Sequence, residues 1–398
     1  MRGIALAAVA VLAFGATGAA ATYAKLQGNI DQVDVSSLVG ERPSSPPPNP
    51  DDPSAGQPVN FLVLGSDERD GENGEIGGHV GGMRSDTTMV VHISADRSRV
   101  EVVSIPRDSL VPIPSCTMSN GSTTPARRLD MFNSAFATGW DNGGDIASAA
   151  ACTIKTVQES TGLWIDHFVV VDFAGFQRMV DAIGGVSICI PNDMHSEDAK
   201  LDVKAGEQVL DGPTALAFAR ARKGEGVGDG SDINRIGNQQ RLVAAMVTEV
   251  MSKNVLTDVP QLIRFLSAAT DSLTIDNQLS LNDLAGLAYN MRDIRSGNIT
   301  FVTIPWAPAP SNPNRVVWKP EAATIWANLA ADVPALGEPD DTTPDTGTPS
   351  NTPTSDSPTS EAPTGDTSAP SDTPTPQQTK KAGRDAFSPD DVTAVCAS

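Results

Sequence analysis

The sequence predicts an α/β domain in which a single mixed β-sheet is wrapped by helices. Short apolar runs alternate with segments of helical period, and this alternation is typical of strands and amphipathic helices in one domain. No internal repeat interrupts the pattern. Of the 398 residues, those from 59 to 338 form the predicted folded domain, and about 280 residues suffice for one well-buried core.

The predicted strands begin with Phe61–Leu64, a short apolar run before a polar, glycine-rich loop. Thr88–Ile93 and Arg99–Ile105 are expected to form a strand pair that is joined by a tight turn. The remaining predicted strands of the sheet are Trp164–Val171, Val186–Ile190 and Ile299–Ile304.

Helical spacing predicts the elements between these strands. Ala174–Ile183 ends at a glycine pair, which is a C-cap signal. Asp211–Ala221 begins with an aspartate N-cap and a proline in its first turn. Asp232–Lys253 is a long helix with its apolar residues on one side, and further helices are expected over Val259–Ala269 and Ser280–Met291.

Residues 1–25 predict a membrane anchor or a signal segment. The uncharged run Ile4–Ala24 would form a helix of about 31 Å, which is long enough to cross a bilayer. Arg2 precedes it, so the positive-inside rule places the rest of the chain outside the membrane. The alternative is a signal peptide that is cleaved near residues 19–21. We therefore expect a single-pass protein of the cell membrane with an extracytoplasmic domain, or a secreted protein after cleavage.

Residues 26–58 predict a proline-rich linker, and residues 339–385 predict a disordered tail. From Asp340 to Thr379, 26 of 40 residues are Ser, Thr or Pro, and none is Lys or Arg. Such a segment buries too little apolar surface to fold. Residues 386–398 form a last segment that we expect a disulfide to tie to the core.

Four cysteines fit an exported chain and allow three pairings. No CxxC pair is present and the four histidines are scattered, so we expect no zinc site. We predict the pair Cys116–Cys152, which would staple a loop to a helix, and the pair Cys189–Cys396. Free buried thiols are the alternative.

The net charge of −21 argues against a nucleic-acid-binding protein, which usually presents a basic surface. Arginine nevertheless outnumbers lysine 19 to 9. This bias is informative because the planar guanidinium group binds phosphate through two hydrogen bonds.

Charged residues cluster where the predicted strands end. Residues 65–69 (GSDER) follow the first strand, residues 84–88 (RSDTT) precede the second, and residues 104–108 (SIPRD) end the third. If the first and third strands run parallel with the second between them, all three motifs lie at one edge of the sheet. Ligands bind at such an edge in open α/β sheets.

Two further motifs follow. Arg220 and Arg222 can converge only if their helix ends beside them, because residues two apart on a helix diverge by about 200°. The glycine-rich run 224–230 fits no nucleotide motif, so an anion-binding turn and a plain linker both stay open. Arg235 and Gln239 are four residues apart and share one helix face.

Together the motifs GSDER, RSDTT, SIPRD, FARAR and DINRIGNQQ, which occur in this order over about residues 59–255, resemble the LytR-CpsA-Psr (LCP) family of cell-wall glycopolymer ligases. The resemblance implies an LCP-like α/β/α core and a Mg²⁺-dependent phosphotransferase. Such an enzyme moves a glycopolymer from a polyprenyl-pyrophosphate lipid onto peptidoglycan through a phosphodiester bond. The Ala- and Gly-rich, cysteine-paired style of the chain favours the actinobacterial type and arabinogalactan or a related polymer.

The resemblance also implies roles for individual residues. Asp67 and Asp86 match the aspartates that hold the metal. The residues that match the pyrophosphate-binding set, with a polar residue near the head group as its last member, are Arg84, Arg107, Arg220, Arg222, Arg235 and Gln239.

One position departs from the family pattern: a second arginine often occurs three residues after Arg235, and here that residue is Asn238. Head-group affinity or preference is therefore expected to differ. As the general base we expect Asp232 first and Asp108 second, beside Arg107. An ion pair between Asp232 and Arg235 with no further role is the alternative.

General chemistry agrees with these assignments. Charge-assisted arginine contacts to a diphosphate contribute about 1.5–3 kcal/mol each, and converging arginines would repel one another without an anion between them. Mg²⁺ is commonly held by one or two carboxylates and substrate phosphates. The apolar segments Phe168–Val171, Ala215–Phe218 and Asp232–Lys253 either line a tunnel for the polyprenyl tail or pack as ordinary core.

Two other functions stay open at this point. A polyprenyl-pyrophosphate pyrophosphatase would use water in place of the sugar hydroxyl. A non-catalytic lipid-binding or regulatory protein of the cell envelope would bind the lipid without turnover.

Overall fold

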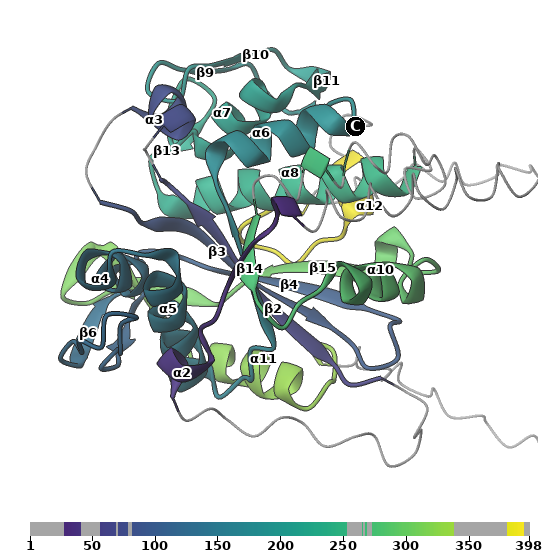
Figure 1. Ribbon diagram of the computed structural model, residues 1–398. Coiled ribbons are helices and arrows are strands. Elements are labelled where there is room, and N and C mark those ends of the chain that lie inside the picture. Colours follow the sequence, from purple (N-terminus) through teal and green to yellow (C-terminus); the bar gives the residue numbers. More distant parts are fainter. Residues whose placement is uncertain are drawn as a thin grey trace, which may run out of the picture.

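In the computed structural model, residues 28–40, 56–68, 71–78, 82–252, 265, 267–268, 273–337 and 380–393 are described. Within these residues a seven-stranded mixed sheet forms the centre, in the order β1-β14-β7-β2-β3-β4-β15 (Figure 1). Its strands are β1 (Asp31–Val33), β2 (Val59–Ser66), β3 (Ser85–Ile93), β4 (Val100–Ile105), β7 (His167–Val171), β14 (Leu273–Asp276) and β15 (Ile299–Thr303).

The strand directions agree with the arrangement on which the motif argument depends. β3 lies antiparallel between β2 and β4, so β2 and β4 run the same way. β7 is parallel to β2, and β15 is parallel to β4. The ends of β2, β4 and β7 and the start of β3 therefore meet at one edge of the sheet.

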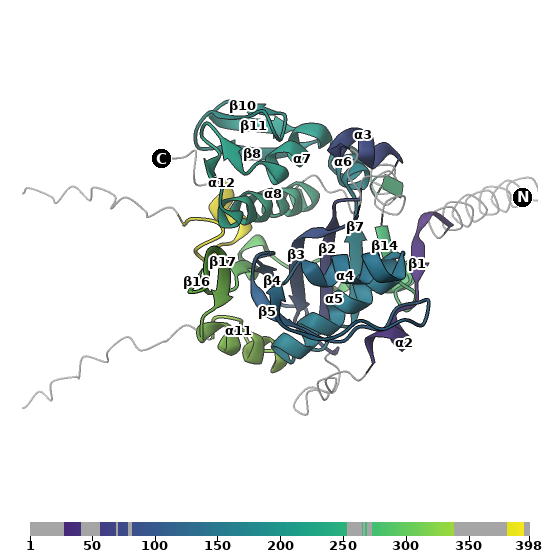
Figure 2. The same ribbon diagram turned by 90° about the vertical axis from the view of Figure 1, so that its left-hand side faces the viewer.

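Helices cover both faces of the sheet (Figures 1 and 2). Alternate residues of β2 enter different cores, with Leu62 on one face and Phe61 on the other, as the pleat of a strand requires. The first core is covered by α2 (Ser36–Val39), α4 (Ser134–Gly143), α5 (Ile146–Thr161) and α11 (Glu321–Ala330). The second is covered by α6 (Phe173–Ala182), α7 (Gly212–Arg220), α8 (Asp232–Ser252), α10 (Leu281–Asn290) and α12 (Pro389–Thr393).

The predicted mixed sheet is present at the centre of the fold, but it is not the only sheet. Five two-stranded ribbons accompany the central sheet in the described part of the chain. They are β5 (Leu110–Ile113) with β6 (Arg127–Met131), β8 (Val186–Ile190) with β11 (Gly206–Leu210), β9 (Met194–Ser196) with β10 (Leu201–Val203), β12 (Lys223–Gly224) with β13 (Gly228–Asp229), and β16 (Trp306–Ala309) with β17 (Asn312–Trp318).

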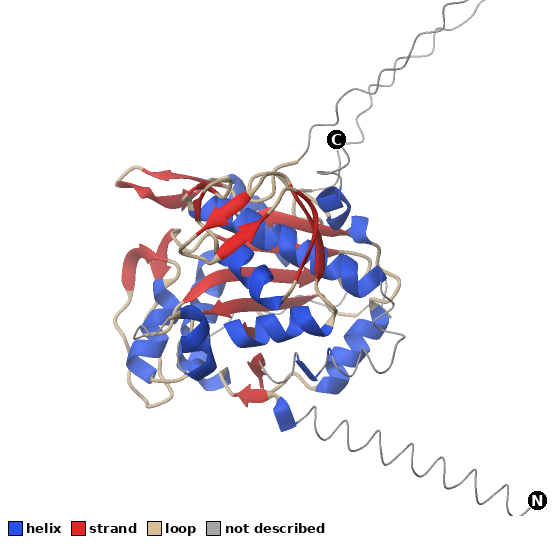
Figure 3. Ribbon diagram, turned by 90° about the horizontal axis from the view of Figure 1, so that it is seen from above, coloured by secondary structure: helices blue, strands red, loops and turns tan. Residues whose placement is uncertain are grey.

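Of the strands predicted for the central sheet, Val186–Ile190 forms β8 outside it. The backbone N–H of Ser187 donates to Glu249 of α8 at 3.0 Å, and Ile188 and Ile190 are buried in the second core. The apolar side of this strand therefore packs on the layer of helices. Figure 3 shows this layer and the short two-stranded ribbons from above.

Part of the predicted linker 26–58 belongs to the fold. β1 pairs in parallel with β14 and forms one edge of the sheet. α2 follows, and its Val39 is fully buried in the first core. The apolar residues that anchor this segment are few and lie among polar ones. The overall composition of residues 26–58 therefore did not indicate that part of the range is folded.

Several predictions fall on residues outside the described part of the chain. Among them are the membrane anchor or signal segment at residues 1–25, most of the helix predicted over Val259–Ala269 and most of the tail predicted over residues 339–385. The described residues contain no helix with the length and apolar character needed to span a bilayer. The short helix α3 (Gly71–Gly77) and the 3₁₀ turn at Ser296–Asn298 complete the described elements.

One predicted disulfide is present. Cys116 and Cys152 are bonded, with their Cα atoms 5.3 Å apart, and both are buried. The bond joins the segment after β5 to α5, as expected from the sequence. Cys189 is also disulfide-bonded, but the predicted pairing with Cys396 lies outside the described residues.

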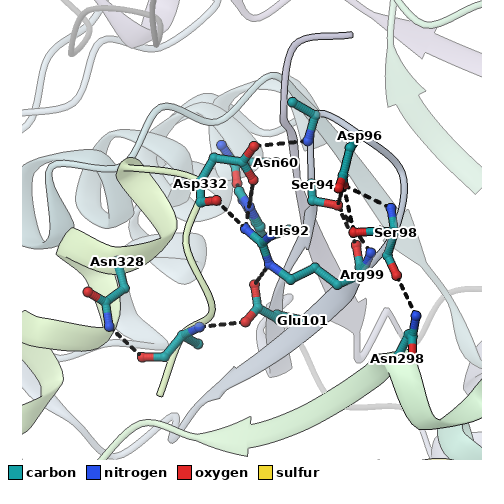
Figure 4. A network of polar contacts seen from close by, with 12 residues as sticks. Asn60, His92, Ser94, Asp96, Ser98, Arg99, Glu101, Asn298, Asn328 and Asp332 are labelled. Atoms are coloured by element: carbon teal, nitrogen blue, oxygen red, sulfur yellow. Dashed lines mark hydrogen bonds and ion pairs between the residues drawn. The ribbon is translucent and has the colours of Figure 1, made fainter. Parts of the chain in front are cut away.

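A polar network lies at the other end of the central strands, away from the motif residues (Figure 4). Asp332 lies after α11 and accepts hydrogen bonds from Arg99 Nη2 at 2.8 Å and from the backbone N–H of Ala95 at 3.0 Å. It also contacts the buried His92, whose other ring nitrogen is 2.7 Å from Asn60 Oδ1. Glu101 accepts from Arg99 and from the backbone of Ala335.

Replacement of Asp332 by alanine is expected to lower the free energy of unfolding by about 2–3 kcal/mol, because several donors lose a charged acceptor at once. The positive φ of 56° at Asp332 adds to the cost, since alanine tolerates it less well than aspartate. Urea unfolding measures the change. Asp293→Ala serves as the control, because the Asp293 side chain is 83% exposed. Equal stability of the two variants would contradict this role for the network.

Candidate active site

A β-bulge places Asp86 at the edge of the sheet where the ends of β2, β4 and β7 meet. Gly65 pairs with Thr87 and Ser66 pairs with Ser85, so Asp86 is the extra residue of β3. Bulges re-aim a side chain without shifting the rest of the strand. Asp86 Oδ2 lies 2.7 Å from Arg107 Nη1 and 3.2 Å from Arg235 Nη1.

Arg107 follows β4 and contacts a second carboxylate. Its Nε is 3.4 Å from Asp232 Oδ1, and its backbone N–H donates to Asp232 Oδ2 at 3.3 Å. The Arg107 side chain is only 16% exposed. One arginine therefore links the strand carrying Asp86 to the helix carrying Asp232.

The first turn of α8 supplies the other half of the cluster. Asp232 is the first residue of the helix, and Arg235 lies one turn later with 4% of its side chain exposed. Arg235 Nη2 is 2.5 Å from Asp232 Oδ1 and 2.7 Å from the backbone oxygen of Asp86. The predicted ion pair between Asp232 and Arg235 exists, but it is one part of a larger network.

The two carboxylates respond differently to burial. Burial alone would raise the pKa of Asp86, but the charges of Arg235 and Arg107 and their hydrogen bonds outweigh it and hold the pKa below its usual value. Burial raises the pKa of Asp232, and the same arginines offset only part of that effect. Asp232 is therefore the carboxylate better suited to accept a proton.

Arg222 joins the cluster because α7 ends at Arg220 and the next residue, Ala221, is extended. Burial, and then the charges of Arg107 and Arg235, lower the pKa of Arg222. Its buried Nε has no hydrogen-bond partner among the described residues, and the same holds for the Nε atoms of Arg107 and Arg235. The clustered arginines therefore keep donors that an additional anion could use.

The other predicted binding residues make different contacts. Arg220 stacks over the ring of Phe173 at 4.5 Å, and Arg84 is exposed. Gln239 is 8% exposed and donates to the backbone oxygen of Ala219 at 3.2 Å, which holds the end of α7 against α8. The shared helix face of Arg235 and Gln239 does not bring both side chains to the same partners.

The glycine-rich run 224–230 is an ordered hairpin formed by β12 and β13. A Cβ atom at Gly224, where φ is 138°, would lie 2.0 Å from the backbone oxygen of His195. The glycines therefore permit close packing on β9. The plain-linker interpretation was wrong.

Asp67 lies beside the bulge. Its Oδ1 accepts from the backbone N–H of Arg84 at 2.5 Å, and its own N–H donates to the backbone oxygen of Arg84. The described residues hold no group of three His, Cys, Asp or Glu side chains that could ligate a metal. A Mg²⁺ ion that takes two carboxylates and completes its shell with phosphate oxygens and water still fits this donor set.

The sequence did not predict the contacts that Asp108 and Ser109, which follow Arg107, make with β17. Arg315 in β17 lies 3.4 Å from Asp108 Oδ1, and the N–H of Val316 donates to the backbone oxygen of Asp108 at 3.2 Å. Trp318 Nε1 donates to Ser109 Oγ at 3.0 Å. Asp108 Oδ2 is 3.8 Å from Arg107 Nε. No motif marked this hairpin, because its contacts arise from tertiary packing.

The structure also bears on two wider expectations. The arginines do not repel one another unopposed, since Asp86, Asp232 and Asp108 lie among them. Of the segments considered for a polyprenyl tunnel, Ala215, Phe218, Val169 and the apolar side of α8 pack in the second core, whereas Phe168 lies in the first. A tunnel lined by these segments stays a prediction.

Comparison with known proteins agrees with this fold and motif order. The model of the LytR_cpsA_psr family matches residues 17–331. A probable cell wall biosynthesis protein LcpB from Corynebacterium glutamicum is 33% identical over 255 residues, which cover 63% of this chain and 55% of that protein. The teichoic acid transferase TagT of Bacillus subtilis is 30% identical over 288 residues, 71% of this chain and 78% of that protein.

The chain spans about half the length of the two corynebacterial relatives that it matches. Among solved structures, the LytR-Csp2A-Psr enzyme from Actinomyces oris superposes with a TM-score of 0.53 at 22% identity, covering 76% of this chain and 96% of that one. This likeness shows a shared mixed α/β fold. Together with the family match over most of the chain, it shows that the protein belongs to the LytR_cpsA_psr family.

Proposed function

We propose that the protein is an extracytoplasmic phosphotransferase that moves a glycopolymer from a polyprenyl-pyrophosphate carrier onto peptidoglycan. The observation that carries the proposal is the cluster of Arg107, Arg222 and Arg235 around Asp86 and Asp232. Relatives named polyisoprenyl-teichoic acid–peptidoglycan teichoic acid transferases support it.

The proposed chemistry assigns a task to each part of the cluster. The arginines bind the diphosphate, and Arg222 gains the anion that its buried Nε lacks. The acceptor hydroxyl oxygen attacks the phosphorus that carries the glycopolymer, and the bond to the bridging oxygen breaks. Polyprenyl phosphate leaves with that oxygen, while the hydroxyl proton passes to the Asp232 carboxylate. Holding the phosphorus in line with the hydroxyl is the main catalytic contribution in such reactions.

We propose that Asp67 and Asp86 hold Mg²⁺ when the substrate is bound. The ion would neutralise charge that develops on the phosphate oxygens. Arg107 and Arg235 both donate to Asp86 Oδ2, so the orientation of this carboxylate is fixed before any ligand arrives. We also propose that the protein is bound to the cell membrane, with its catalytic domain outside the membrane.

The function is tested with the full chain, a lipid-pyrophosphate-linked oligosaccharide and peptidoglycan fragments. Joined product that requires the acceptor is the expected result. Release of polyprenyl monophosphate at the same rate without acceptor would instead identify a pyrophosphatase. Lipid binding without turnover in Mg²⁺ would identify a non-catalytic lipid-binding protein.

Chelation of divalent ions is expected to lower the transfer rate by at least about 100-fold, because metal stabilisation of the transferring phosphoryl group contributes several kcal/mol. Added Mg²⁺ should restore the rate. Asp67→Asn should require more Mg²⁺ for half-maximal activity, whereas Asp293→Ala should not. Full activity in the chelator would remove the metal from the mechanism.

A further inference from the structure

The C-terminal segment, residues 380–393, packs on the helix that carries Asp232 and Arg235. It lies beyond residues 17–331, which match the family model, and it follows the Ser/Thr/Pro-rich stretch. The segment appears in yellow beside α8 in Figures 1 and 2. It begins six residues earlier than the predicted segment 386–398, so residues 380–385 are part of the packed structure and not of a disordered tail.

Backbone meets backbone where the segment crosses α8. A Cβ atom at Gly383, where φ is 83°, would lie 2.6 Å from the oxygen of Ile233 and 2.9 Å from the nitrogen of Gly237. A Cβ atom at Gly237 would lie 2.5 Å from the oxygen of Ala382. Two glycines therefore allow the segment to touch α8 within one turn of Arg235.

Gln240 connects the segment to the sheet. Its Oε1 accepts from the N–H of Gly383 at 2.9 Å, and its Nε2 donates to Ser104 Oγ at 2.9 Å and to Thr303 Oγ1 at 3.1 Å. Gln240 is fully buried. Ser104 is three residues before Arg107. The Gln240 side chain therefore sets the distance between α8 and β4, the strand that leads to Arg107.

The segment also completes the edge of the sheet. Phe387 exchanges two backbone hydrogen bonds with Phe301 of β15, at 2.8 and 3.1 Å, and the two rings stack with centroids 5.2 Å apart. Phe387 and Val392 are buried in the second core. These contacts anchor the segment on the C-terminal side of Gly383.

We propose that residues 380–393 form a strap that positions α8 against β4, and thereby holds Asp232 and Arg235 at the correct distance from Arg107. Gly383 and Gln240 are its positioning residues, since neither contacts the ion pairs of the cluster directly. For its effect on catalysis the proposal rests on the proposed transferase activity, but its effect on anion binding can be measured separately.

A matched pair of glycine variants in the full chain tests the strap. Gly383 and Gly337 have similar φ values, 83° and 79°, but a Cβ at Gly337 would have no atom within 4 Å. Both alanine variants carry the same backbone strain, and only Gly383→Ala pushes the segment away from α8. We expect Gly383→Ala to lower kcat by about 10- to 100-fold, as displacement of catalytic groups by about 1 Å does. Gly337→Ala should keep the wild-type kcat.

The readouts separate positioning from general stability and from the proposed function. Activity and inorganic pyrophosphate affinity are measured well below the midpoint of thermal unfolding of both variants. A lower midpoint with unchanged kcat and affinity would overturn the strap. If the wild type transfers nothing, the transferase proposal fails, and the strap is then judged on whether Gly383→Ala alone loses pyrophosphate affinity.

A second experiment covers the case in which Gly383→Ala does not fold. A protease site placed within residues 338–379 of the full chain is cleaved after folding, disulfides are reduced, and the released C-terminal piece is removed. Activity and pyrophosphate affinity should fall and should return when a synthetic peptide of residues 380–393 is added. The reduced, uncleaved chain is the control. Unchanged activity and affinity after removal of the piece would overturn the proposal.

Discussion

Arg107→Ala is expected to lower the transfer rate by about 10²–10⁴-fold, more than the loss of a single hydrogen-bond donor, because Arg107 both binds the substrate and fixes two carboxylates. Its guanidinium group contacts Asp86 and Asp232 at 2.7 and 3.4 Å. Without it, both aspartates lose one charged partner, and only Arg235 is left to offset the repulsion between them. Steady-state transfer with the lipid-linked oligosaccharide measures the effect.

Two companion variants sharpen this test. Arg107→Lys keeps the charge but loses the planar fork, so only a partial recovery is expected. Arg292→Ala removes an arginine whose side chain is 49% exposed and should leave the rate unchanged. Equal product from wild type and Arg107→Ala would exclude the arginine cluster from the mechanism.

Asp232→Asn is expected to reduce transfer by about 10²–10⁴-fold, the range over which a positioned general base contributes. Asparagine is nearly the same size and leaves the packing of α8 largely intact. It cannot accept the hydroxyl proton. The variant should still bind inorganic pyrophosphate, which distinguishes lost proton transfer from a lost binding site.

The pH dependence gives an independent check on the same residue. Burial raises the pKa of Asp232 above its ordinary value of 3.8. A base must be deprotonated to act, so the wild-type rate should fall as the pH drops through that raised pKa, earlier than for an ordinary carboxyl group. Asp108→Asn should keep this acid limb. If the limb disappears in Asp108→Asn instead, Asp108 is the base.

The meeting of the motifs at one edge of the sheet could be predicted from the sequence, because strand ends can be predicted from apolar runs. Asp67, Asp86 and Arg107 each follow or precede such a run, and the order of β2, β3 and β4 brings them to one edge. The bulge at Asp86 was not predictable, since one unpaired residue leaves no periodic trace.

Residues whose role depends on tertiary packing were harder to place. Arg220 and Arg222 belong to one motif, yet Arg220 stacks on Phe173 while Arg222 joins the cluster. Gln239 and Gln240 are adjacent, and only the structure shows that Gln240 links α8 to the sheet and to the C-terminal segment. Residues 31–39 have four apolar residues in a stretch too short to show a clear period, and residues 380–385 have only one, so their contacts could not be predicted.

The described structure stops at Gly337 and resumes at Lys380. When both ends of a chain segment are held, each doubling of its length adds only about 0.6 kcal/mol of closure entropy. Insertions and deletions between these two residues can therefore accumulate during evolution with little effect on the folded domain. Related proteins with the same strap can differ greatly in the number of residues between the two points.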